Sequence, residues 1–148
     1  MTCIKAKALC IFRHQDKVLL SLGYNSDKNE HYLRPIGGTI EFGETSLQAI
    51  QREVLEEIHQ KIIHPRLLGV IENLFSFDSR QGHEVVFMYQ AEFVDPTVYS
   101  LNEIQGYETD GSTYIAKWLS LEQLASAQYR VYPKEIEQWF FDNRQPDL

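Results

Sequence analysis

The sequence predicts a single domain of the α+β or mixed α/β class, and three observations lead to this prediction. The elements that the sequence favours run as mostly strands, one helix, more strands and then two helices. The chain has 148 residues, 43% hydrophobic and 24% charged, which suits one globular domain with a substantial core. No internal repeat and no linker divides residues 1–148.

Strands open the chain. Residues 4–13 and 18–22 alternate in polarity and predict two strands around a polar turn at 14–17. Residues 23–31 are rich in turn formers and predict a loop, which would either border a site or form a plain solvated connection. Residues 32–43 combine short extended pieces with one proline and three glycines.

The first helix is predicted to begin near Thr45. Thr45 or Glu44 stands where an N-cap belongs, and residues 46–58 contain neither Gly nor Pro. Four apolar residues recur at intervals of three, four and four, which builds one apolar stripe: Leu47, Ile50, Val54 and Ile58.

The second half of the chain is predicted to hold strands over 66–77, 83–94 and 113–121, a turn over 78–82 and a polar connection over 99–112. Ser120, with Gln123 three residues later, matches a capping box for a short helix over 121–127. Pro133 stands at the first turn of a last helix over 134–143.

Charge and composition exclude several classes of protein. A net charge of −7 argues against a broad surface for duplex nucleic acid, which needs clustered Lys and Arg. No apolar run approaches the roughly 18–20 residues that cross a bilayer, and the N-terminus lacks a signal peptide's apolar segment. We therefore expect no membrane partner and a cytoplasmic location. On one extended strand, Cys3 and Cys10 would lie about 20 Å apart, too far for a disulfide.

An acidic cluster stands on the predicted first helix. Glu53, Glu56 and Glu57 are spaced i, i+3 and i+4 and share one face, about 100° from the apolar stripe. Such clusters are commonly solvated flanks, although each like-charged i,i+4 pair costs about 0.2–0.5 kcal/mol. A hard divalent cation such as Mg²⁺ would convert this repulsion into coordination. Gly37 and Gly38, in the preceding loop, allow the backbone to approach a ligand closely.

The spacing of these residues resembles the signature of the Nudix hydrolases, G-x5-E-x7-R-E-U-x-E-E-x-G-U, where U is aliphatic. The matching positions are Gly38, Glu44 and the run Arg52-Glu53-Val54-Leu55-Glu56-Glu57. The strand order and residues 117–124 also resemble that family. The resemblance implies an α/β/α sandwich with a mixed sheet and a loop-helix-loop catalytic element.

The resemblance also implies a chemistry. Nudix hydrolases typically cleave a nucleoside diphosphate linked to another moiety, using Mg²⁺ or Mn²⁺. Residue by residue, it assigns metal binding to Glu53, Glu56 and Glu57, with the carbonyl of Gly38 as a further ligand. It pairs Arg52 with Glu44, in a structural role that holds the loop against the helix and the ligands in place.

The end of the signature departs from the family. His59 and Gln60 replace the glycine and the aliphatic residue. Because His tolerates a left-handed helix end less well than Gly, we expect a changed exit with one more helical turn through Lys61. His59 is interpreted as a helix-end residue favoured by the dipole, and a substrate or metal contact is the alternative.

The general base lies outside the signature in many such enzymes. Glu108, in the predicted connection before the 113–121 strand, is the first candidate for base or added ligand. Glu84, at the start of a predicted strand, is the second. The alternative for both is a surface glutamate. The candidates for stacking on a base are Tyr24, Tyr32, Phe75, Phe77 and Tyr107, although such aromatic residues usually pack in the core.

Three functions remain open at the level of sequence. The first is metal-dependent hydrolysis of a phosphoanhydride in a small nucleotide derivative, such as a nucleotide sugar, dinucleoside polyphosphate, ADP-ribose or nucleoside triphosphate. The second is a non-catalytic Nudix-like module that binds nucleotides. For either function, the resemblance implies a homodimer as a candidate assembly. The third, removal of phosphate from an mRNA 5′ end, needs a basic groove, for which the only candidates are Lys5, Lys7, Arg13, Lys17 and Arg34.

Overall fold

Strand β1 (Lys5–Ile11) is an interior strand of the first of two sheets. The computed structural model describes residues 2–25, 28–77, 79–126 and 130–140. In the first sheet the strand order is β5-β1-β7-β6, with β5 over Ile36–Thr39, β6 over Ile62–Phe77 and β7 over Arg80–Phe93. Because β1 runs parallel to β7 and antiparallel to β5, this sheet is mixed.

The second sheet is built mainly of antiparallel strands. Its order is β10-β4-β3-β9-β8, and β2 pairs with β3 off this path. The bounds of its strands are Arg13–His14 (β2), Lys17–Asn25 (β3), Glu30–Arg34 (β4), Glu103–Tyr107 (β8), Thr113–Ser120 (β9) and Arg130–Val131 (β10). Only the short β10 runs parallel to its neighbour, β4.

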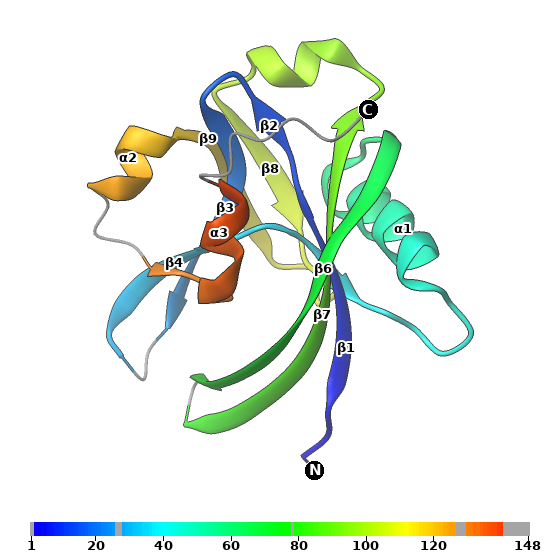
Figure 1. Ribbon diagram of the computed structural model, residues 1–148, viewed down its shortest axis with the longest axis vertical. Coiled ribbons are helices and arrows are strands. Elements are labelled where there is room, and N and C mark those ends of the chain that lie inside the picture. The colour runs from blue at the N-terminus through cyan, green and yellow to red at the C-terminus, as the bar shows by residue number, and fades with distance from the viewer. Residues whose placement is uncertain (1, 26–27, 78, 127–129, 141–148) are drawn as a thin grey trace.

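The helices lie on two sides of these sheets (Figure 1). Helix α1 (Ser46–Ile58) covers one side, and α2 (Leu121–Ala125) and α3 (Glu137–Phe140) lie on the other. Two 3₁₀ turns, η1 (Pro96–Ser100) and η2 (Lys134–Ile136), complete the elements of the described residues. Among those residues, no helix is long and apolar enough to cross a membrane.

Alternation along β1 supplies both layers of the core. Ala8 and Cys10 belong to a cluster with Ile50 and Val54 of α1. Leu9 and Ile11, which alternate with them along the strand, belong to a second cluster on the other face. That second cluster includes the C-terminal residues Ile136 and Phe140. Each fully buried aliphatic side chain contributes roughly 1.5–3 kcal/mol. The predicted α/β class, with helices on both sides of mixed β-structure, is confirmed.

Three segments predicted as loops or turns contain strands. Residues 23–31 belong largely to the β3–β4 hairpin, residues 80–82 of the predicted 78–82 turn begin β7, and the 99–112 connection contains the end of η1 and all of β8. In β8, Ile104 and Gly106 are buried while their neighbours are exposed, so the strand alternates between faces although it is mostly polar. The predicted helix over 134–143 begins as a 3₁₀ turn, and its residues 141–143 lie outside the described residues, as do 26–27, 78 and 127.

Both cysteines are free thiols. Cys3 is exposed and Cys10 is buried within β1, so the predicted absence of a bridge between them is confirmed.

Candidate active site

The N-terminus of α1 is fixed by a reciprocal cap. The hydroxyl of Thr45 accepts a hydrogen bond from the backbone N–H of Gln48, and the Gln48 side chain accepts one from the Thr45 N–H. This capping box confirms the predicted start of the helix. The buried face consists of Ala49, Ile50, Glu53, Val54, Glu57 and Ile58, so two acids lie inside while the predicted stripe residue Leu47 is exposed.

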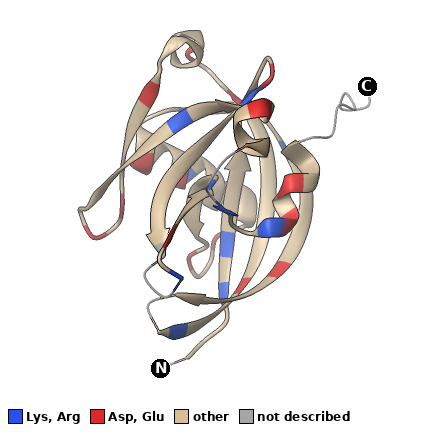
Figure 2. Ribbon diagram, turned by 90° about the vertical axis from the view of Figure 1, so that its left-hand side faces the viewer, with Lys and Arg blue, Asp and Glu red and all other residues tan. Residues whose placement is uncertain are grey.

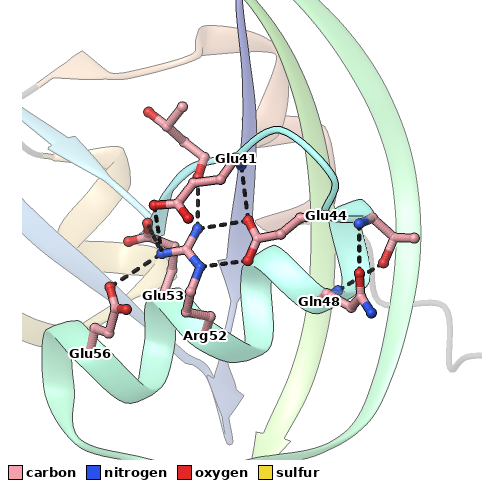
Figure 3. Close-up of polar contacts among 8 residues, drawn as sticks. Glu41, Glu44, Gln48, Arg52, Glu53 and Glu56 are labelled. Atoms are coloured by element: carbon pink, nitrogen blue, oxygen red, sulfur yellow. Dashed lines mark hydrogen bonds and ion pairs between the residues drawn. The ribbon is translucent and has the colours of Figure 1, made fainter.

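Arg52 connects the helix to the loop that precedes it (Figure 3). Its Nε donates to Glu44 Oε2 at 2.6 Å and its Nη2 donates to Glu44 Oε1 at 2.9 Å, which is a bidentate pair. The same Nη2 donates to the carbonyl oxygen of Thr39 at 2.9 Å. Hydrogen bonding from Arg52 lowers the pKa of Glu44 to about 2, so this carboxylate stays charged at neutral pH.

Arg52 also contacts two of the three predicted metal ligands. Its Nη1 donates to Glu53 Oε1 at 2.8 Å and to Glu56 Oε2 at 3.2 Å. The signature predicts the contact with Glu44, and Arg52 and Glu56 have the i,i+4 spacing of neighbours on a helix. Arg52 therefore neutralises part of the acidic cluster as well as bracing the loop.

Glu53 and Glu57 form a buried carboxyl pair, whereas Glu56 lies apart. The first two residues are 6% and 7% exposed, and the Glu56 side chain is 60% exposed beside Arg52. Burial first, and then hydrogen bonding with Glu53, raises the pKa of Glu57, which shows that this pair is unfavourable when both groups are charged. Within the described residues, no three acidic, imidazole or thiol groups converge as a metal site. Glu56 would have to turn from Arg52 to join one.

Gly37 and Gly38 lie on strand β5, not in the loop that the sequence predicts, and they bring that strand against this pair. A Cβ on Gly38 would lie 2.5 Å from the Glu53 carboxyl carbon, so no other residue leaves that carboxyl where it is. At Gly37 a Cβ would lie 2.1 Å from the backbone oxygen of Ala8, across the β1–β5 ladder. The donors gathered here are all oxygens, which fits a hard divalent cation.

The spacing of the signature does not predict the residue that contacts Glu57. Tyr114, on β9, donates its hydroxyl to Glu57 Oε1 at 2.6 Å. It faces Gly106 across the β8–β9 ladder, and a Cβ at Gly106 would lie 2.1 Å from the Tyr114 ring. A glycine opposite an aromatic residue is the only sequence signal for this contact, and it requires the strand pairing to be known.

The two candidate bases lie in different parts of the site. Burial, then Glu57 and then the charge of Glu108 raise the pKa of Tyr114, so Glu108 belongs to the surroundings of the carboxyl pair. Glu84 lies on β7, where its carboxylate is 3.9 Å from Nζ of Lys7. Burial, and then the charge of Arg34, lowers the pKa of Lys7.

An aromatic pocket adjoins Glu84 and Arg34. Its cavity volume is about 60 Å³, which is smaller than the roughly 300–1,000 Å³ of typical small-molecule sites. The lining residues are Leu9, Tyr32, Arg34, Asn73, Phe75, Ser76, Phe77, Glu84, Tyr132 and Pro133. Three of the five stacking candidates line it. The other two do not, since Tyr24 is exposed on β3 and Tyr107 lies beside His59.

The helix exit differs from the expectation. Helix α1 ends at Ile58, and His59 adopts the left-handed conformation, with φ 58° and ψ 38°. The predicted additional turn through Lys61 is wrong, because His59 takes the geometry usual for glycine and donates its N–H to the Leu55 carbonyl at 3.0 Å. The His59 ring packs against Tyr107 with centroids 5.3 Å apart.

Known proteins share this architecture. The model of the NUDIX domain family matches residues 4–140. A NUDIX hydrolase from Nitrosomonas europaea is 22% identical, with 97% of this chain and 93% of that chain covered at a TM-score of 0.66. A MutT NUDIX hydrolase from Burkholderia pseudomallei is 19% identical, with 95% and 99% covered at 0.68. The chain therefore belongs to the NUDIX domain family, and it has the fold of these NUDIX hydrolases.

Proposed function

We propose that the chain hydrolyses a phosphoanhydride bond in a nucleoside diphosphate linked to another moiety, with Mg²⁺ or Mn²⁺ as cofactor. The observation that carries this proposal is the order of three features along β1 and its neighbours. They are the Glu53–Glu57 pair, the cations Lys7 and Arg34, and the aromatic pocket. Acid, cation and aromatic groups in this order match the metal, phosphate and base of a bound nucleotide.

Electrostatics connect the first two features. Lys7 has a side chain only 16% exposed, and the charges that act on it include Arg34, Glu84 and Glu53. Lys7 is therefore within electrostatic reach of one acid of the carboxyl pair and of two residues that line the pocket. Two partly desolvated cations close together favour an anionic ligand, and a diphosphate supplies concentrated negative charge.

The aromatic pocket supports a nucleoside as the organic part of the substrate. Tyr32 and Tyr132 pack edge to face with centroids 5.5 Å apart, and Tyr32 also meets Phe77 at 6.1 Å. Asn73 and Ser76 add amide and hydroxyl groups for hydrogen bonds to a base or ribose. An apolar pocket with a few polar groups is the usual form of a small-molecule site.

The metal ligands would be Glu53 and Glu57, joined by the Gly38 carbonyl and by Glu56 once it turns from Arg52. A divalent cation bound there would supply positive charge that neutralises phosphate oxygens and favours departure of the leaving phosphate. By binding Glu44 and the Thr39 carbonyl, Arg52 keeps the end of β5 and the loop that follows it against the helix. Lys7 and Arg34 bind the phosphates and orient the scissile bond.

Glu108 is the favoured general base. Its charge acts on both Glu57 and Tyr114, so it can accept a proton from a water molecule near the carboxyl pair. Glu84 instead pairs with Lys7 and lines the pocket, which favours a role in substrate binding. We expect Glu108→Gln to lose turnover. We expect Glu84→Gln to stay active with a raised KM, and the two results together would support this assignment.

A substrate screen tests the proposal. Nucleotide sugars, dinucleoside polyphosphates, ADP-ribose and nucleoside triphosphates are incubated with and without Mg²⁺ or Mn²⁺. We expect metal-dependent release of a nucleoside monophosphate or phosphate from at least one compound, and loss of that activity in Glu57→Gln. The matched control is Glu92→Gln, whose exposed carboxylate contacts His64. Full activity in Glu57→Gln would remove Glu57 from the mechanism, and metal-dependent stabilisation without turnover would favour the non-catalytic module.

The mRNA 5′-end alternative receives less support. Figure 2 shows Lys and Arg interspersed with Asp and Glu over the strands on the side of the protein that faces the viewer, which is the left-hand side of Figure 1. The proposal above assigns Lys7 and Arg34 to binding the phosphates of a small substrate. Lys17 is exposed on β3. A homodimer stays a prediction.

A further inference from the structure

The carboxylate of Glu57 is held by a residue far from the helix that carries it. Tyr114 is 57 positions away in the chain, and its hydroxyl donates to Glu57 Oε1 at 2.6 Å. This length is at the short end of the usual range for an O–H···O hydrogen bond. Glu57 is 7% exposed, so water has little access to replace the tyrosine as a donor.

The sheet is built so that the ring can reach this position. Tyr114 pairs directly with Gly106, and a Cβ at Gly106 would lie 2.4 Å from Cε1 and 2.5 Å from the hydroxyl oxygen of the ring. Gly106 does not have a positive φ, so its backbone does not require glycine. The missing side chain instead lets the Tyr114 ring lie across β8 toward α1.

The hydrogen bond also has a defined direction. The phenol hydroxyl carries the proton of this hydrogen bond and donates it to the carboxyl oxygen. It engages only Oε1, which leaves the second oxygen of Glu57 outside this hydrogen bond. Groups that orient a metal-binding carboxylate in this way typically change metal affinity 10–100-fold when removed.

We propose that Tyr114 is a positioning residue that holds the Glu57 carboxylate in the orientation in which it binds a divalent cation beside Glu53. The proposal rests on the metal site proposed above. Tyr114 does not contact the reacting atoms, and its effect passes through Glu57. Loss of its hydroxyl weakens metal binding and leaves turnover at saturating metal largely intact.

The test measures binding of Mn²⁺ alone to the 148-residue chain by isothermal titration calorimetry. Tyr114→Phe keeps the ring and its contact with Gly106 and removes only the hydroxyl. We expect its Kd for Mn²⁺ to rise by roughly 10–100-fold. The turnover defect should be large at limiting Mn²⁺ and shrink as Mn²⁺ is raised.

Tyr99→Phe is the matched control. The Tyr99 hydroxyl also makes a partly buried hydrogen bond, as acceptor from the backbone N–H of Phe93 at 2.9 Å, and Tyr99 packs against the same core cluster. If Tyr114 had only a structural role, the two variants would lose similar stability and bind Mn²⁺ like the wild type. We expect the Kd for Mn²⁺ to be unchanged in Tyr99→Phe.

A second variant, Gly106→Ala, retains the tyrosine but displaces its ring, and it should also weaken Mn²⁺ binding. An unchanged Kd in Tyr114→Phe overturns the proposal for Tyr114 and leaves the metal site standing. If Glu57→Gln binds Mn²⁺ as tightly as the wild type, the metal site fails and the role of Tyr114 fails with it. Weaker binding in Tyr114→Phe, with Tyr99→Phe unchanged, supports both.

Discussion

His59 ends α1 in a conformation that glycine adopts more easily, and this position offers a quantitative test of the helix exit. The perturbation is a pair of variants, His59→Gly and His59→Ala, compared with each other. Both variants remove the contact between the His59 ring and Tyr107, so the loss of this contact cancels when their stabilities are compared. Alanine keeps the cost of a left-handed backbone with φ 58°, and glycine does not.

The magnitude follows from two opposing terms. The left-handed conformation costs an L-residue roughly 1–2 kcal/mol, and glycine loses about 0.5–1 kcal/mol of extra chain entropy on folding. Taking these together, His59→Gly should exceed His59→Ala by about 0.5–1 kcal/mol in the free energy of unfolding. For a chain of this size that corresponds to roughly 1–4 °C in Tm.

Urea and thermal unfolding followed by circular dichroism measure this difference. Gln51, exposed in the middle of α1, supplies the control, because there glycine should be less stable than alanine by about 1 kcal/mol. The order of the two variants is thus expected to reverse between positions 51 and 59. If His59→Ala is as stable as His59→Gly, the left-handed helix end described above is wrong.

Two further predictions concern Gly38 on β5 and Glu44 in the loop that follows this strand. In Gly38→Ala the new methyl group would lie 2.5 Å from the Glu53 carboxyl, which can move aside, so we expect stability within about 1 kcal/mol of wild type but roughly 100-fold lower kcat/KM; unchanged kcat/KM would contradict the contact. The pKa of Glu44 is lowered from 4.5 to about 2 by Arg52, so its stabilising effect is present above about pH 4.5 and lost as the pH falls toward 2. Glu44→Gln should therefore flatten the dependence of stability on pH in that window, while Glu103→Gln, exposed near Lys117, should retain the wild-type slope; equal slopes in all three proteins would refute the pairing.

The parts of the site that are local in sequence could be predicted from it. Thr45 and Gln48 interact over three residues, and the Arg52–Glu44 pair spans one loop and two turns of helix. Such contacts depend on spacing alone, because helix geometry converts spacing directly into distance. The Arg52–Glu56 contact follows from the same i,i+4 spacing. Which acids of that helix are buried could not be predicted in this way, because burial depends on the strands packed against it.

The parts that depend on strand pairing could not be predicted. Lys7 acts near Arg34 and Glu84 only because β1 lies between β5 and β7 in the sheet. The pocket joins residues from β1, β4, β6 and β7 with Tyr132 and Pro133. Distances of this kind require the order of strands, and no local pattern encodes it.

The segments that were predicted as loops or turns also contribute to the site. A glycine opposite an aromatic residue explains both facts. Three antiparallel pairs have this form: Gly23–Tyr32, Phe75–Gly82 and Gly106–Tyr114. In each pair a Cβ on the glycine would lie within 2.4 Å of the facing ring. The three glycines fall in the segments 23–31, 78–82 and 99–112, where glycine and polar residues favour turns.

In the folded sheets those glycines instead let large rings lie flat across a neighbouring strand. Two of the rings, Tyr32 and Phe75, line the aromatic pocket, and the third, Tyr114, reaches Glu57. A residue that weakens strand propensity locally therefore creates the space in which the site is built. For this chain, a glycine inside an otherwise alternating segment indicates a facing aromatic residue at the site more usefully than it indicates a turn.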